Sequence, residues 1–230
     1  MALIEELDIQ PEQLPAMPVL AMALFEQSGL TDLIDSEFNN DKRKILTPGN
    51  TVKSVIGANF MPMRRVPIYL LDEFYGVAPV DLLFGSKVKH GCLNDRAYER
   101  NLDSLFGIDL PRLLNRCYSH LCERYGLDSS VFNIDSTNFT ITSFEKEIDE
   151  DAAMPQRCGH AKDGHNDRLV YSLLSITDEN GIVCYEKPYD GATADSEMDR
   201  HAVEFLATVS EPKATTLVAD CKIVTVRSYP

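Results

Sequence analysis

The sequence lacks the features that mark a secreted or membrane-spanning protein. Crossing a bilayer takes about 20 predominantly apolar residues, and the longest apolar runs, such as residues 19–25, are far shorter. The N-terminus has no basic segment followed by an apolar one, so it does not resemble a secretory signal peptide. We therefore expect a cytoplasmic protein with no membrane partner.

A recognisable cysteine framework is also missing. The six cysteines are scattered through the chain, and without a secretory context free thiols are expected. Cys117, His120 and Cys122 lie close together, and Cys158 lies near His160 and His165. Neither group has the paired ligand spacing of a structural zinc site.

Basic charge is scarce. The chain has 22 lysines and arginines against 36 aspartates and glutamates, which gives a formal net charge of −14. A module whose only role is to bind nucleic acid usually has a basic excess. The balance therefore argues against a simple DNA-binding module, but not against an enzyme that gathers cations around carboxylates.

The first half of the chain has the apolar spacing of helices. Gly29 and Gly126 are expected to end helices, the turn Thr47-Pro48-Gly49-Asn50 and the pair Asn94-Asp95 to cap them, and the pair Thr31-Asp32 to start a new one. Helices are predicted over residues 17–38, 51–60, 69–75, 97–106 and 110–125.

After residue 128 the pattern becomes that of β-strands. Residues 130–142 alternate β-branched or aromatic with polar side chains, which predicts one strand or a pair. Two further strands are expected over 169–177 and 182–186, and Asn180-Gly181 between them predicts a hairpin. A helix over 196–209 and a short buried strand over 214–219 complete the predicted α+β pattern.

Two aspartates occupy related positions in these strands. Asp135 lies inside the first predicted strand, and Asp220 follows the last one directly. A carboxylate among apolar strand residues is costly unless a cation or hydrogen bonds compensate it, and a divalent metal relieves repulsion between two of them. Mg²⁺ prefers oxygen ligands and supports in-line phosphoryl displacement. In the simpler interpretation, Asp135 caps a turn through Ser136-Thr137 and Asp220 caps the next helix.

Motifs around these aspartates follow one another in a recognisable order. Asn133-Ile134-Asp135-Ser136-Thr137 comes first; residues 159–165 (GHAKDGH), the loop 178–181 (DENG), residues 189–195 (YDGATAD) and Val218-Ala219-Asp220 follow. Residues 71–76, 81–85 and 93–96 precede them in the helical half. Together they resemble the insertion-sequence DDE transposases of the ribonuclease H-like class, in the branch with a helical N-terminal domain of unknown function.

The resemblance implies a fold, a metal and a substrate. After a lead-in segment over residues 1–16, it implies a helical domain over 17–128 and a partial ribonuclease H-like α/β domain with a mixed sheet over 129–230. Asp135 and Asp220 match the first and second catalytic aspartates, which implies Mg²⁺ or Mn²⁺ as cofactor. Cleavage and strand transfer at transposon-end DNA, near the nucleoid, is the implied activity. Lys162, His165 and Arg168, on the loop between the aspartates, are candidates for contacts with DNA phosphates.

The sequence departs from the family pattern in three places. Residues 221–224 (CKIV) replace the usual glycine and aromatic or hydroxyl residues, and Asp163-Gly164-His165 stands where Asp-His-Arg is usual. The third carboxylate, a downstream glutamate in the family, has no counterpart, because the chain ends ten residues after Asp220. We therefore expect a C-terminally truncated transposase that is inactive alone.

Two other functions stay open on these residues. One is a non-catalytic fragment that forms a homo-oligomer or pairs with a full-length transposase and inhibits it. The other is a phosphohydrolase-like enzyme that uses Asp135 and Asp220 by themselves. Two basic groups, 42–44 and 64–65, either contact phosphates or belong to solvated helix ends.

Overall fold

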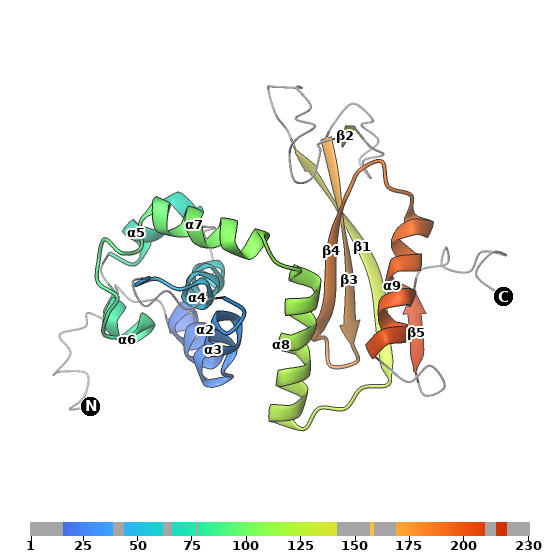
Figure 1. Ribbon diagram of the computed structural model, residues 1–230, viewed down its shortest axis with the longest axis horizontal. Helices are drawn as coiled ribbons and strands as arrows, with labels where there is room; N and C mark the ends of the chain where they lie inside the picture. Colours follow the sequence, from blue (N-terminus) through green and yellow to red (C-terminus); the bar gives the residue numbers. More distant parts are fainter. Residues whose placement is uncertain are drawn as a thin grey trace. The chain divides into compact units, whose positions relative to one another are not determined.

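The computed structural model divides the chain into two compact units, Met1–Asp109 and Leu110–Pro230. The first unit is helical and the second contains a mixed sheet with helices (Figure 1), so the α+β class predicted from the sequence is confirmed. No helix in the described part of the chain has the length and apolarity to cross a membrane. The structure describes residues 16–38, 44–61, 66–76, 78–141, 157–158, 169–209 and 215–219.

The helical unit is built around two buried tyrosines. The hydroxyl of Tyr75 donates to the carbonyl oxygen of Ser54 (2.7 Å), and that of Tyr98 donates to Ser54 Oγ (3.0 Å). Burial raises the pKa of Tyr98 to about 12, so both hydroxyls act here as neutral donors. The elements are α2 (Ala16–Gln27), α3 (Leu30–Asp35), α4 (Pro48–Asn59), the 3₁₀ helix η1 (Ile68–Leu70), α5 (Leu71–Phe74), α6 (Val80–Phe84) and α7 (Asp95–Phe106).

Three of the helix starts test the predicted caps. Thr47 accepts a hydrogen bond from the Asn50 amide at the start of α4, and Asn94 accepts one from the Ala97 amide at the start of α7, both at 3.2 Å. The predicted cap at Thr31-Asp32 is wrong. The N-cap of α3 is Gly29, whose φ of 81° is left-handed, and the hydroxyl of Thr31 donates to Glu26 instead.

We expect Asn94→Ala to lower the free energy of unfolding of the helical unit by about 1 kcal/mol. The substitution removes the acceptor for the Ala97 amide and the donor to the carbonyl of Gly91. Thermal unfolding followed by circular dichroism would measure the loss. Asn94→Asp retains the acceptor and should lose less; equal stability of all three proteins would contradict the capping role.

The second unit contains five strands in one mixed sheet. β3 pairs antiparallel with both β1 and β4, and β5 pairs parallel with β1 on the side away from β3 (Figure 1). The two-residue β2 pairs with β3 and was not predicted, since two residues show no periodicity. The elements are α8 (Leu110–Tyr125), β1 (Val131–Ile141), β2 (Arg157–Cys158), β3 (Leu169–Asp178), β4 (Val183–Asp190), α9 (Asp195–Val209) and β5 (Thr216–Ala219).

The β3–β4 hairpin is held by the side chain of Asp178, which is 1% exposed. Its Oδ1 accepts from the amides of Asn180 (2.9 Å) and Ile182 (2.8 Å), and Gly181 adopts a φ of 78°. The hydroxyl of Tyr118, on α8, donates to Oδ2 at 3.4 Å. The hairpin predicted from Asn180-Gly181 is confirmed, and the carboxylate before it supplies the local hydrogen bonds.

The sheet of this unit has one apolar face and one polar face. Phe132 and Ile134 of β1 and Leu174 and Ile176 of β3 point to the apolar face, where side chains of both α8 and α9 pack against them. Tyr118 of α8 joins this core, and α8 belongs to the compact unit that begins at Leu110.

Four cysteines whose side chains the structure describes are free thiols. They are Cys92, Cys117, Cys122 and Cys184. Burial raises the pKa of Cys117 to about 11 and that of Cys184 to about 12. Both thiols are therefore protonated at neutral pH, which disfavours a nucleophilic or metal-binding role.

Candidate functional site

Of the residues that the resemblance assigns to metal or DNA binding, Asp135 is the one that the structure describes. Asp220, Lys162, His165 and Arg168 lie outside the described residues. The site is therefore built from Asp135, from the strands on either side of it, and from the last described residue before Asp220.

Asp135 lies on β1 with its side chain on the polar face of the sheet. Phe132 and Ile134 of the same strand are buried on the opposite, apolar face, whereas Asp135 is exposed. Its Oδ1 accepts a hydrogen bond from the amide of Ser136 at 2.8 Å. The premise that this carboxylate is surrounded by apolar groups is therefore wrong: water can solvate it, because successive side chains of a strand point to opposite faces.

The hydrogen bond to Ser136 agrees with part of the simpler interpretation, in which Asp135 caps a turn. β1 however continues to Ile141, so no turn follows Asp135. The carboxylate lies in the middle of a paired strand, and none of the ion pairs between described residues involves it. Its second oxygen is left to water or to a cation.

The parallel ladder between β1 and β5 ends one residue before each of the two aspartates. The ladder runs from Val131 opposite Thr216 to Ile134 opposite Ala219. The residue that follows Ile134 is Asp135, and the residue that follows Ala219 is Asp220. Neighbouring strands lie about 4.8 Å apart, and consecutive Cα atoms about 3.8 Å. The chain leading to Asp220 is thus beside Asp135.

A second carboxylate shares the polar face with Asp135. Ser175 of β3 lies opposite Asp135, and Glu186 of β4 lies opposite Ser175. Ser175 Oγ donates to Glu186 Oε1 at 3.0 Å. The three residues form a row across β1, β3 and β4 that the sequence reasoning missed.

The row does not amount to a metal centre by itself. Among the described residues, no group of three or more histidines, cysteines, aspartates and glutamates could hold a metal ion. The hydroxyl of Ser175 separates Glu186 from Asp135, with backbones about 10 Å apart across two strand spacings. A ligand set around Asp135 therefore depends on Asp220. Strand alternation could have placed Glu186 on this face, but only the pairing register shows which residue it faces.

Comparison with protein families identifies part of the helical half. Residues 10–119 match the family model described as "Domain of unknown function (DUF4277)". The match covers the described helices from α2 to α7 and extends into α8. The N-terminal part of the chain is therefore similar to a domain of unknown function, which agrees with that part of the expected resemblance. No curated protein and no solved structure matches the sequence.

Proposed function

We propose that the sheet unit is a metal-dependent phosphoryl-transfer domain related to the insertion-sequence DDE transposases, acting on transposon-end DNA. Asp135 and Asp220 are the proposed ligands of Mg²⁺ or Mn²⁺. The observation that carries the proposal is the parallel β1–β5 ladder, whose last pair, Ile134 and Ala219, immediately precedes the two aspartates. If β5 continued in register by one residue, both carboxylates would emerge side by side on the polar face.

The chemistry of Asp135 fits such a site. Mg²⁺ keeps several waters and binds one or two carboxylates together with substrate phosphates. Asp135 offers an exposed carboxylate whose orientation the Ser136 amide restrains, and no described lysine or arginine neutralises it. A bound divalent ion would supply charge stabilisation for in-line displacement at a phosphate.

The remaining assignments belong to the same proposal. Lys162, His165 and Arg168, in the segment before β3, are proposed to contact DNA phosphates. The resemblance assigns no third carboxylate within the 230 residues. With two carboxylates, we propose that this chain binds metal but does not cleave or transfer a DNA strand by itself.

One observation favours the alternative of a non-catalytic fragment that pairs with a second copy or with a full-length transposase. α2 exposes three large apolar side chains at helical spacing, Met17, Leu20 and Leu24, with exposed fractions of 49–55%. Apolar residues gathered on one helix face are typical of interaction surfaces. Sedimentation velocity with and without a full-length homologue distinguishes the two roles: a chain that stays monomeric in both conditions excludes the alternative.

We expect the purified chain to bind Mn²⁺ while leaving DNA intact. Electron paramagnetic resonance would measure free Mn²⁺ during a titration, and denaturing gels would detect cleavage of duplexes that carry the sequences flanking the coding region. Hydrolysis of p-nitrophenyl phosphate that depends on Mg²⁺ and on Asp135 would instead indicate a phosphohydrolase. Absence of Mn²⁺ binding would overturn the metal site, and cleavage of the flanking duplexes would overturn the inactivity of this chain.

A further inference from the structure

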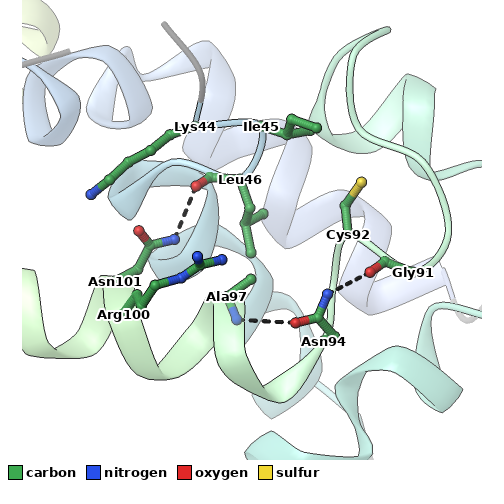
Figure 2. A pocket seen from close by; sticks show the side chains of 9 residues that line it. All are labelled: Lys44, Ile45, Leu46, Gly91, Cys92, Asn94, Ala97, Arg100 and Asn101. Atoms are coloured by element: carbon green, nitrogen blue, oxygen red, sulfur yellow. Dashed lines mark hydrogen bonds between the residues drawn. The ribbon is translucent and has the colours of Figure 1, made fainter. Parts of the chain in front are cut away.

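The helical unit contains a pocket of about 410 Å³ that the proposed metal site does not use. It lies between the segment before α4 and the start of α7 (Figure 2). In Figure 2 the polar side chains of Lys44, Asn101 and Arg100 are grouped at one end of it, and Leu46 and Ala97 lie between them and the loop at Gly91–Asn94. The lining residues are Lys44, Ile45, Leu46, Gly91, Cys92, Asn94, Ala97, Arg100 and Asn101.

The charge of the pocket lining is opposite in sign to the net charge of the protein. The chain has a net charge of −14, yet the described residues that line the pocket include two cations and no carboxylate. Neither Lys44 nor Arg100 takes part in an ion pair with a described residue. Glu99 and Asp103 lie close to Arg100 in sequence on α7, but they are exposed and do not line the pocket.

Among the described residues, none occupies the terminal donors of the two cations. Arg100 donates through Nε to the carbonyl of Arg96 at 3.1 Å, which positions its side chain along α7. Its two terminal nitrogens can therefore donate to a ligand. Lys44 is exposed and makes no hydrogen bond with a described residue.

Asn101 is fixed in the wall rather than available to an anion. It is 2% exposed, and its amide nitrogen donates to the carbonyl of Leu46 (3.0 Å) and to Thr51 Oγ1 (2.8 Å). Both hydrogens of that nitrogen are used, so an anion in the pocket would bind to Lys44 and Arg100.

The rest of the lining is suited to an uncharged, partly apolar body. Leu46 and Ala97 are buried, and Ile45 extends the apolar wall to the surface. A pocket of this volume is within the range that holds small molecules and cofactors. Two cations at one end and an apolar wall beside them match a ligand that carries a phosphate on a flat or apolar group.

We infer that this pocket binds a nucleotide unit, with its phosphate between Lys44 and Arg100 and its sugar and base along Ile45, Leu46 and Ala97. The unit is either a free nucleotide or one residue of a DNA strand. The second source rests on the proposed function, whereas binding of a phosphate does not. Of the basic residues 42–44, Lys44 is the one that the structure describes, and we assign it this binding role.

The inference is tested by binding measurements in EDTA, where the proposed metal site cannot contribute. Calorimetry with deoxyadenosine monophosphate examines the free nucleotide, and fluorescence anisotropy with a labelled 5′-phosphorylated single-stranded oligonucleotide examines the strand. We expect Lys44→Gln and Arg100→Gln each to weaken binding about tenfold or more, because each removes a charge-assisted hydrogen bond.

Arg96→Gln is the matched control, since Arg96 is an exposed arginine one turn earlier on α7 and does not line the pocket. It should bind like the unchanged protein, and all variants should keep the same circular dichroism spectrum. Binding of the monophosphate that is lost in the two pocket variants supports a free nucleotide. Binding of the oligonucleotide alone, lost in the same variants, supports a strand.

Two results overturn the inference. One is that the unchanged, folded protein binds neither probe. The other is that Arg96→Gln weakens binding as much as Arg100→Gln, which would indicate a diffuse charge effect rather than this pocket. Neither result tests the proposed metal site, because Mn²⁺ binding through Asp135 is measured separately and in the absence of nucleotide.

Discussion

Asp135→Asn is expected to weaken Mn²⁺ binding by at least about a hundredfold. Loss of a group that only supports a metal ligand costs about 10–100-fold in affinity, so loss of a ligand should cost at least as much. The asparagine side chain has nearly the same shape and can still accept the hydrogen bond from the Ser136 amide, but it has no negative charge. The change therefore separates charge from structure.

The fold should tolerate this substitution. Asp135 is exposed on the polar face of the sheet, where substitutions usually change stability by no more than about 0.5 kcal/mol. Thermal unfolding would check that stability is retained, and the Mn²⁺ titration would measure affinity. Glu179→Gln, which removes an exposed carboxylate from the β3–β4 turn of the same unit, is the control. Equal affinities of the Asp135 and Glu179 variants would exclude Asp135 as a ligand.

Glu186→Gln is informative in the same titration. Glu186 shares the polar face with Asp135, but it accepts a hydrogen bond from Ser175 of the neighbouring strand β3, which lies between them. We expect a much smaller loss of Mn²⁺ affinity than for Asp135→Asn, since a carboxylate about 10 Å away acts through its field rather than by coordination. A loss equal to that of Asp135→Asn would make Glu186 a ligand and would change the proposed set.

The second large effect is expected at a buried cation in the helical unit. The side chain of Lys53 is 3% exposed, and its Nζ lies 2.7 Å from Glu26 Oε2 and 5.4 Å from the centre of the Phe84 ring. Glu26→Gln should lower the free energy of unfolding by about 2 kcal/mol, because it leaves the ammonium buried without a counter-charge. The figure is below that of a fully buried pair because the side chain of Glu26 is 55% exposed.

Lys53→Met should cost much less than Glu26→Gln, although it removes the same ion pair. Methionine has a similar length, places no charge in the core and can contact the Phe84 ring, while Glu26 is left partly in water. Thermal unfolding of both variants and of Glu73→Gln, an exposed control, would test this order. If Lys53→Met were the more damaging variant, the buried ion pair would itself be stabilising.

The difference between the unchanged protein and Glu26→Gln should depend on pH. Burial raises the pKa of Glu26, but hydrogen bonds from Lys53 and Thr31 and the charge of Lys53 lower it. The lowering effects together are larger, so the pKa of Glu26 is below 4.5. The ionised form is therefore favoured in the folded state. Its contribution is complete above 4.5 and is lost as the pH falls through the folded pKa.

Asp35 contributes with the opposite sign. Burial raises its pKa, against hydrogen bonds from Thr47 and the Gly49 amide. Folding therefore favours its protonated form, and its contribution grows as the pH falls. Asp35 is present in both proteins, so most of its effect cancels in the comparison; the part of its raised pKa that comes from the charge of Glu26, the smallest of the causes, does not. The two unfolding curves should thus converge below pH 4.5, and a constant difference down to lower pH would contradict the role of the Glu26 charge.

Much of the local structure follows from the sequence alone. Residues 110–125 form α8 as predicted, because their apolar spacing and Gly126 are local signals that need no partner. The caps at Thr47 and Asn94 and the hairpin at Asn180-Gly181 are confirmed for the same reason. Where a local signal was ambiguous, as at Thr31-Asp32, the contact with Glu26 decided its outcome.

The sequence by itself determined the α+β order of elements, the identity of the candidate aspartates and the motifs that link them. Only the tertiary structure decided that Asp135 is solvated on an open face, that Glu186 faces Ser175, and that α8 packs with the sheet. It also brought Lys44 and Arg100 to one pocket from segments far apart in the chain. The physical reason is that periodicity and turn chemistry depend on near neighbours, whereas register, face and pocket lining depend on which distant segments pair and pack.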